Sequence, residues 1–453
     1  MSRVVVLGID GLDWDLLNQW KEELPTFRRL IEEGSGNRME SVIPTLSCPA
    51  WPCMFTGLEP SGLNMYDFID LTNGRLFTSE DWWEKSLFYR FDRDGIKQVL
   101  INLAFSYPPH KLLNGILSCG LGTPIVKSTY TYPKAFEKEL EDSNLLVDIS
   151  VRGRERSNRD MLSDMLRREY LNILQTLTTK PFDLFFGTFF TLDYIQHYYW
   201  KDMIGGDSSY EGMIKENYQY IDSLIGNLLS LVEDSTIIIV SDHGQGPHTK
   251  GFNINRWLEK KGFLKFKHDL REGFWSKVVK GVAKTSIGHR LGQLVVPIIP
   301  ERIWRGASEG GRLKNLTADL YSTIDWNNTV AYSPSQSSGC IFVKDGLMIR
   351  EYLGIDRIAS NIKDIKEGLR QIGLECKETN WRKDFREARC GGHLRVLPTN
   401  GIYPMNTWSK EIWQDHSWSG SHTLNGVFLS NNKDLRCEGI PSVAPLIERL
   451  VKE

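Results

Sequence analysis

One serine and a set of aspartates and histidines are the residues of this sequence whose types suit catalysis. Ser47 lies at the start of a predicted short helix. The acidic and imidazole side chains fall into four separate clusters, which are Asp10, Asp193 with His197, Asp242 with His243, and His422. Carboxylate and imidazole groups bind divalent transition metals, and a hydroxyl between two such ions is an effective nucleophile. The set therefore predicts a two-metal hydrolytic site with Ser47 as nucleophile.

The segment around Ser47 carries signals for a helix. Pro49 suits the first helical position, where the missing N–H costs nothing, and Gly57 suits the exit. Ser47 is then expected beside the positive end of the helix dipole, which favours an anion such as phosphate.

Four apolar runs predict the strands that must carry the clusters. They cover residues 3–10, 99–103, 182–190 and 236–240, and each has the continuous apolar pattern of a strand buried on both faces. Asp10 ends the first run, Asp193 follows the third, and Asp242 follows the fourth. Ligands of open α/β sheets collect at the carboxyl ends of strands. The sequence therefore predicts an α/β fold in which three strands deliver carboxylates to one edge.

The expected organisation is a single elaborated catalytic domain over residues 1–453, with a mixed, largely parallel sheet between helical layers. The stretch 260–312 is rich in Lys and Arg, carries Trp275 and Trp304, and is predicted to be a cap insertion. The polar stretch 346–395, helical at 356–372, is predicted to be a small subdomain insertion.

Composition is that of an ordinary globular protein, with 453 residues, 25% charged and 41% hydrophobic. The net charge of −2 argues against specific binding to nucleic acid or anionic membranes. Seven cysteines without a CxxC pair predict reduced thiols. No signal-peptide pattern precedes the first strand and no apolar run reaches membrane-spanning length, so the cytoplasm is the expected compartment. The sequence gives no indication of the oligomeric state.

Each cluster also has a structural interpretation. Asp10 alone fits the cap of a following helix, and Asp193 with His197 fits a surface pair on a helix. His422 alone fits a turn. Three further histidines lie near the clusters without comparable partners and are expected to be structural, namely His248, His393 and His416.

The conjunction of these motifs resembles the alkaline phosphatase superfamily, and within it the type I phosphodiesterase/nucleotide pyrophosphatase family. The segments that carry the resemblance are 8–11, 44–57, 193–197, 241–244, 252–258, 325–326, 331–333 and 419–426. The resemblance implies a first metal held by Asp193, His197 and His422. It implies a second metal held by Asp10, Asp242 and His243, with Ser47 bridging toward both. Zn²⁺ is the expected ion, with Mn²⁺ and Fe²⁺ as alternatives.

Departures from the family pattern bear on the substrate. Many relatives have Thr in the place of Ser47. A related sulfatase signature matches Ser47 and Pro49 but has Arg where Trp51 stands, which argues against sulfate esters. The residue that contacts a phosphate oxygen in relatives falls near Asn64 or Asp67, and an aspartate repels a dianionic monoester more than a singly charged diester.

The expected function is therefore hydrolysis of a phosphodiester or pyrophosphate bond in a small, nucleotide-like substrate, through a phosphoseryl intermediate. A phosphomonoesterase, phosphonate hydrolase or phosphotransferase on the same site is the alternative. A scaffold that binds a membrane or a partner through the stretch 260–312 is the alternative of another class. The complete set of ligand positions favours an enzyme.

Overall fold

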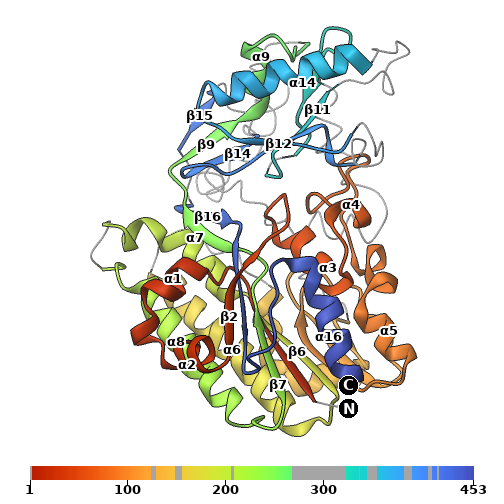
Figure 1. Cartoon of the computed structure of the whole chain (residues 1–453), viewed down its shortest axis with the longest axis vertical. Coiled ribbons are helices and arrows are strands. Elements are labelled where there is room, and N and C mark those ends of the chain that lie inside the picture. The colour runs from red at the N-terminus through yellow and green to blue at the C-terminus, as the bar shows by residue number, and fades with distance from the viewer. Residues whose placement is uncertain are drawn as a thin grey trace, which may run out of the picture. The chain divides into compact units, whose positions relative to one another are not determined.

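The computed structural model of the chain forms two compact units (Figure 1). The first consists of Met1–Leu63, Phe77–Pro247 and Trp418–Glu453, and the second consists of Asn64–Leu76 and His248–Ser417. The structure describes residues 3–123, 129–147, 156–205, 209–267, 323–335, 337–343, 355–381, 390–406, 411–415 and 418–453.

An eight-stranded sheet forms the centre of the first unit. In spatial order its strands are β2 (Ser35–Glu40), β17 (Asn425–Ser430), β7 (Thr236–Val240), β1 (Val4–Ile9), β6 (Leu184–Phe189), β3 (Gln98–Leu103), β4 (Gly115–Cys119) and β5 (Thr131–Tyr132). The five strands from β7 to β4 are mutually parallel, whereas β17 and β5 are antiparallel to their neighbours. A separate two-stranded sheet pairs β8 (Gly244–Pro247) with β16 (Gly420–Thr423).

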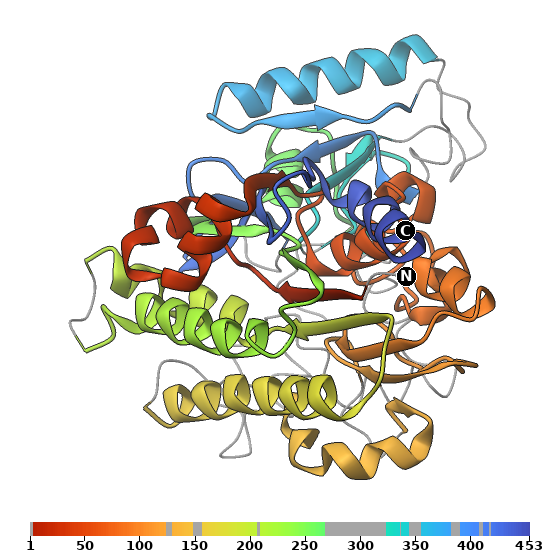
Figure 2. The same cartoon turned by 60° about the horizontal axis from the view of Figure 1, so that its bottom comes forward.

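Helices cover both faces of this sheet (Figure 2). They are α1 (Trp14–Gln19), α2 (Pro25–Glu33), α3 (Ser47–Thr56), α4 (Pro60–Leu63), α5 (Leu87–Arg93), α6 (Arg156–Thr179), α7 (Thr191–Met203), α8 (Met213–Leu229) and α16 (Val443–Lys452). Short 3₁₀ segments lie at Lys21–Glu23, Ser79–Asp81, Trp83–Lys85, Lys134–Val147 and Ile440–Ser442.

Two successive residues of β6 show how the strand alternation builds the layers. Phe185 belongs to an apolar core with side chains of α1, α2, α6, α7 and α8. Phe186 instead packs against Phe55 of α3 and Phe88 of α5, with ring centroids 5.4 and 5.8 Å apart. A strand with both faces buried needs apolar residues at every position. The predicted α/β fold, with a mixed, largely parallel sheet between helical layers, is confirmed.

The second unit is built on smaller sheets. One contains β10 (Ala331–Tyr332), β11 (Cys340–Val343), β13 (Leu394–Val396) and β12 (Cys376–Glu378), and the other contains β14 (Ile402–Met405), β9 (Lys250–Asn253) and β15 (Trp413–Gln414). Two helices, α9 (Ile254–Lys260) and α14 (Ile355–Arg370), contribute to its apolar core.

The predicted elements agree closely with the structure, with one shift at the helix of the serine. The strand predicted at 236–240 is β7, and the other three predicted strands each match an observed strand to within two residues per end. Helix α3 begins at Ser47, two residues before the predicted start at Pro49. Gly57 ends it with the left-handed φ of 75° that favours glycine.

The two predicted insertions are described only in part. Of the stretch 260–312 only residues 260–267 are described, so the predicted cap lies outside the described residues. Within 346–395 the described part contains α14, close to the helix predicted at 356–372. The assignment of all 453 residues to a single catalytic domain stays a prediction.

The seven cysteines all lie in described segments, and each is a free thiol. Among the helices that the structure describes, none combines the length and the apolar character that crossing a bilayer requires.

Candidate active site

Three parallel strands carry carboxylates to one edge of the large sheet. Asp10 follows β1, and its backbone N–H donates to the carbonyl oxygen of Phe189 at 2.8 Å, which continues the strand pairing. Asp242 and His243 follow β7. Helix α7 starts directly after β6 and presents Asp193 in its first turn. The order of the strands therefore brings residues together that lie more than 180 positions apart in the sequence.

Helix α7 and strand β16 position the remaining two histidines. Asp193 and His197 lie one turn apart on α7, so both face the same direction, as predicted. His422 lies on β16, directly opposite Gln245 of β8. A Cβ atom at Gly420 would lie 2.3 Å from the carbonyl oxygen of Gln196. Glycine at this position therefore allows β16 to approach α7 closely.

The three imidazole rings are held in one tautomer. The Nδ1 atoms of His197, His243 and His422 lie 2.8, 3.1 and 2.8 Å from backbone carbonyl oxygens of Gly420, Gly244 and Thr45. A carbonyl oxygen only accepts hydrogen bonds, so each Nδ1 carries a proton and each Nε2 keeps a lone pair. A metal-binding histidine has this arrangement, with the second nitrogen bonded to the surrounding protein.

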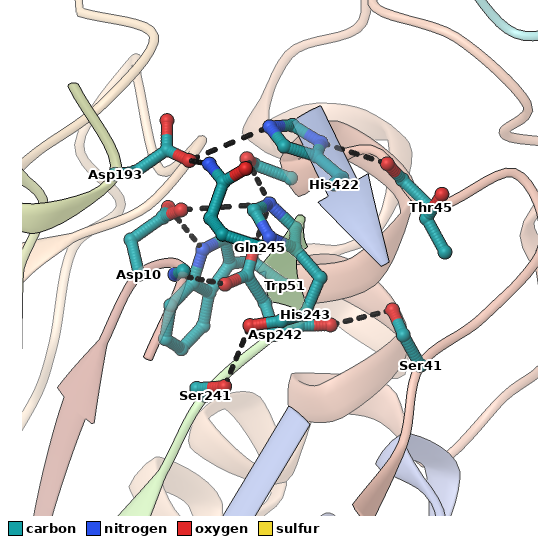
Figure 3. A network of polar contacts seen from close by, with 12 residues as sticks. Asp10, Ser41, Thr45, Trp51, Asp193, Ser241, Asp242, His243, Gln245 and His422 are labelled. Atoms are coloured by element: carbon teal, nitrogen blue, oxygen red, sulfur yellow. Dashed lines mark hydrogen bonds and ion pairs between the residues drawn. The ribbon is translucent and has the colours of Figure 1, made fainter. Parts of the chain in front are cut away.

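The Nε2 atoms lie close to the carboxylates in one buried cluster, and Figure 3 shows the part of it around His243 and His422. His197 Nε2 lies 3.3 Å from Asp193 Oδ2 and 2.9 Å from His422 Nε2. His422 Nε2 lies 3.4 Å from Asp193 Oδ1. The trio of Asp193, His197 and His422 that the resemblance implies is therefore assembled.

A second group of ligand atoms surrounds His243. Its Nε2 lies 3.2 Å from Asp242 Oδ2 and 3.6 Å from Asp10 Oδ1, and 3.2 Å from the hydroxyl of Ser47. Asp10, Asp242 and His243 each offer one ligand atom within 4.8 Å of the others, and so do Asp193, His243 and His422. His243 thus lies near both groups, and its ring stacks on that of His422 with centroids 3.6 Å apart.

This donor set fits divalent cations. Two Nε2 lone pairs that face each other at 2.9 Å, those of His197 and His422, repel unless a cation lies beside them. Among the described residues, the buried atoms Asp10 Oδ1 and Asp242 Oδ2 have no hydrogen-bond partner. Buried carboxylate oxygens without partners are costly in a protein interior, and metal coordination removes that cost.

The pKa shifts of the residues in the cluster also agree with a site for divalent cations. Burial, and then the charge of Asp242, raises the pKa of Asp10 well above its usual value. Burial, and then the charge of Asp193, does the same to the pKa of Asp242. At Asp193 burial, which raises the pKa, is outweighed by the neighbouring imidazoles of His197 and His422, which together hold this pKa well below the usual range. Burial, and then the neighbouring His422, lowers the pKa of His243.

All seven predicted site residues thus lie together in the first unit. The alternative reading of Asp10 as a helix cap is wrong, because Asp13 accepts the N–H groups at the start of α1. Asp10 is instead bonded to the indole of Trp51.

Of the three histidines expected to be structural, two lie in the second unit and His416 lies outside the described residues. His393 Nδ1 accepts a hydrogen bond from the N–H of Val343, which agrees with a structural role, and the ring of His248 lies 5.6 Å from that of Tyr403. Asp67 also belongs to the second unit, where its carboxylate accepts a hydrogen bond from the hydroxyl of Ser335.

Sequence reasoning missed several residues that support the cluster. Trp51 donates to Asp10, and the amide of Gln245 donates to Asp193. The ring of Trp418 stacks on that of His197 with centroids 4.1 Å apart. Their spacing was an available signal, since Trp51 lies one helical turn after Ser47 and Gln245 lies two residues after His243. The partners of these side chains could not be predicted from the sequence, because each contact joins two separate segments of the chain.

A buried glutamate supports the helix that carries Asp193. The carboxylate of Glu169, on α6, accepts hydrogen bonds from the backbone N–H groups of Phe190 and Thr191 at 3.1 and 3.4 Å. Phe190 is the N-cap residue of α7 and makes no side-chain cap bond. Glu169 therefore supplies the missing cap from a neighbouring helix. Burial raises its pKa to about 8, against the opposing hydrogen bond from Phe190.

The raised pKa of Glu169 predicts a pH-dependent stability. Because the unfolded chain gives up this proton near pH 4.5 and the folded chain near pH 8, the free energy of unfolding should fall as the pH rises between these values. For this single group the slope is about 1.4 kcal/mol per pH unit. Glu169→Gln keeps an acceptor but cannot ionise, so its stability relative to the unsubstituted protein should increase from pH 5 to pH 8. Urea unfolding at several pH values measures this, with the exposed Glu233→Gln as control. Parallel pH profiles for Glu169→Gln and the unsubstituted protein would contradict the expectation.

Solved structures share this fold. Murine ectonucleotide pyrophosphatase/phosphodiesterase 5 is 14% identical, with 99% of this chain and 95% of that chain covered and a TM-score of 0.51. Phosphonoacetate hydrolase from Sinorhizobium meliloti 1021, in complex with phosphonoformate, is 13% identical, with 99% and 96% covered and a TM-score of 0.58. The alkaline phosphatase PafA is 12% identical, with 100% and 96% covered and a TM-score of 0.53. At these identities the likeness shows the fold alone.

Comparison at the level of sequence identifies the family. No curated protein sequence matches the chain. The family model of type I phosphodiesterase / nucleotide pyrophosphatase matches residues 4–304, which is more than half of the chain and includes every predicted site residue except His422. The chain therefore belongs to the type I phosphodiesterase/nucleotide pyrophosphatase family, and it is a hydrolase of phosphoester-type bonds.

Proposed function

We propose that the protein cleaves phosphodiester or pyrophosphate bonds in a small, nucleotide-like substrate, through a phosphoseryl intermediate, at a site for two divalent metal ions. The observation that carries the proposal is the buried cluster of three Nε2 lone pairs and three carboxylates beside the hydroxyl of Ser47. Asp193, His197 and His422 would hold one ion, and Asp10, Asp242 and His243 would hold the other. Zn²⁺ suits this mixture of ligands, with Mn²⁺ and Fe²⁺ as alternatives.

Bound ions would supply positive charge and Lewis acidity for the phosphoryl oxygens. The chain's own part begins with Ser47, whose oxygen would form a bond to phosphorus while the bond to the leaving group breaks. Water would then attack the phosphoseryl group and release the phosphoryl product. Because Ser47 is the first residue of α3, the phosphate would also lie at the positive end of that helix dipole.

The family match favours a diester or pyrophosphate substrate over the alternatives. Among the structures that share the fold, an inactive variant of the murine phosphodiesterase was solved in complex with AMP. As part of the proposal, we infer that this chain also acts on a substrate that contains a nucleotide-like group.

A substrate panel tests this proposal. We expect kcat/KM for bis-p-nitrophenyl phosphate and thymidine 5′-p-nitrophenyl phosphate to exceed that for p-nitrophenyl phosphate at least about tenfold, a difference of roughly 1.4 kcal/mol in transition-state binding. Phosphonoacetate tests the phosphonate alternative in the same assay. The Ser47→Ala protein, purified identically, controls for contaminating phosphatases. A monoester or phosphonate preference would replace the proposed substrate class, and absence of turnover on every compound would favour a binding scaffold.

A further inference from the structure

Each proposed ligand set contains one aspartate that accepts a hydrogen bond from a neutral side-chain N–H group outside the sets. Asp10 Oδ2 accepts a hydrogen bond from Trp51 Nε1 at 2.9 Å. Asp193 Oδ1 accepts one from Gln245 Nε2. We infer that Trp51 and Gln245 are positioning residues, each of which fixes one metal-binding carboxylate and so sets the affinity of one of the two metals. This inference rests on the proposed function.

The indole of Trp51 is immobilised by its surroundings. Its side chain is fully buried, and its ring stacks on Phe55 and meets the edge of Phe190. A Cβ atom at Gly8 would lie 2.6 Å from the ring. Glycine at this position of β1 therefore leaves room for the indole. The N–H direction is therefore fixed. It holds Asp10 Oδ2 and leaves Oδ1, which has no hydrogen-bond partner among the described residues, directed to the cluster (Figure 3).

Hydrogen bonds of the Gln245 backbone fix the position from which its side-chain amide extends. The backbone N–H of Gln245 donates to Asp13 Oδ2 at 3.2 Å, and its strand β8 pairs with β16 so that Gln245 lies opposite His422. The side chain is buried, with 3% exposed. Its amide bonds Asp193 Oδ1, while Asp193 Oδ2 lies 3.3 Å from His197 Nε2. Both oxygens of this carboxylate therefore have fixed directions.

The neutrality of both donors matters for metal binding. A lysine or arginine in these places would neutralise the carboxylate and compete with a cation for it. An indole or amide N–H orients the carboxylate without cancelling its charge. Loss of such an orienting hydrogen bond typically weakens metal binding about 10- to 100-fold.

Because Trp51 and Gln245 are bonded to different ligand sets, a test can distinguish the positioning of a carboxylate from a general structural role. The indole N–H of Trp51 donates to a carboxylate of the second set, and the side-chain amide of Gln245 donates to the carboxylate of the first. Each set can be measured alone, because His197→Ala removes a ligand of the first and Asp242→Asn removes a ligand of the second. Zn²⁺ affinity is measured by titration against a competing chelator, which reads binding and not turnover.

In the His197→Ala background we expect Trp51→Phe to weaken Zn²⁺ binding about 10- to 100-fold and Gln245→Met to change it less than about threefold. In the Asp242→Asn background the two substitutions should exchange effects. Matched controls are Trp82→Phe and Gln98→Met, which remove a buried indole and a buried amide bonded to the carbonyl oxygens of Phe105 and Phe88. Neither control should alter Zn²⁺ binding in either background.

Equal weakening of both sets, or no weakening of either, would overturn the inference. Failure of the protein with both sets intact to bind Zn²⁺, Mn²⁺ or Fe²⁺ would instead contradict the proposed function, so the two failures are distinguishable. Circular dichroism establishes that each variant is folded. If Trp51→Phe does not fold, the inference stands or falls on Gln245→Met, which leaves the backbone pairing of β8 unchanged.

Discussion

Ser47→Ala should lower kcat for the best diester by roughly 1,000-fold or more while leaving the protein folded. The hydroxyl is 3.2 Å from His243 Nε2, beside the proposed second ligand set, so its oxygen lies where the attacking group is needed. The structural cost should be small. Ser47 is the first residue of α3 and not its N-cap, which is Leu46, so its side chain contributes no capping bond. We therefore expect the free energy of unfolding to change by less than the ~1 kcal/mol that loss of a cap costs.

A matched control separates chemistry from packing. Ser430→Ala removes a buried hydroxyl that donates to the carbonyl oxygen of Ile237 at 2.7 Å, near the opposite end of β7 from Asp242. It should cost stability but keep turnover. Trapping of radiolabelled phosphate on the acid-quenched protein, present for the unsubstituted chain and absent for Ser47→Ala, measures the intermediate. Near-normal turnover by Ser47→Ala would show that the serine only fills space at the start of the helix.

The sequence was most informative where one segment carries its own signal. The strand ending at Val240 is marked by five residues that are apolar or β-branched, and its bounds were predicted without error. The face shared by Asp193 and His197 follows from helical spacing alone. The start of α3 was misplaced because Pro49 suits a first helical position, whereas the chain already turns helical at Ser47, and Pro49 occupies the third position.

What the sequence could not supply is the long-range pairing around the ligands. His422 lies opposite Gln245 although 177 positions separate them, and its Nδ1 reaches the carbonyl oxygen of Thr45, 377 positions away. A backbone carbonyl has no residue type, so no motif marks it. Glu169 likewise looks like a helix surface residue in the sequence, and only the packing of α6 against α7 shows that it caps another helix. Residue types predicted the ligand set, but tertiary packing supplies the groups that orient it.

Removal of metal should abolish activity and also weaken the fold. We expect about two divalent ions per purified chain, since the cluster contains two groups of three ligand residues, which share His243. A ligand that binds only the folded state adds about 2.7 kcal/mol of stability when its concentration is 100 times its Kd. Without ions the buried carboxylates of Asp10 and Asp242 repel each other, which adds to the loss. Thermal melting and metal analysis, before and after dialysis against a chelator, measure both effects.

Re-addition of single metals then distinguishes the ions, with Zn²⁺ expected to restore more diesterase activity than Mn²⁺ or Fe²⁺. Asp222→Asn is the control for the loss of a carboxylate elsewhere, because Asp222 accepts the N–H groups of Thr26 and Phe27 and lies outside the cluster. This variant should keep about two ions, whereas Asp242→Asn should lose one. A purified chain that contains no metal, and whose activity survives the chelator, would refute the two-metal mechanism even if Ser47 proved essential. Serine chemistry and metal dependence are thus tested independently, since the first concerns the attacking oxygen and the second the charge that surrounds it.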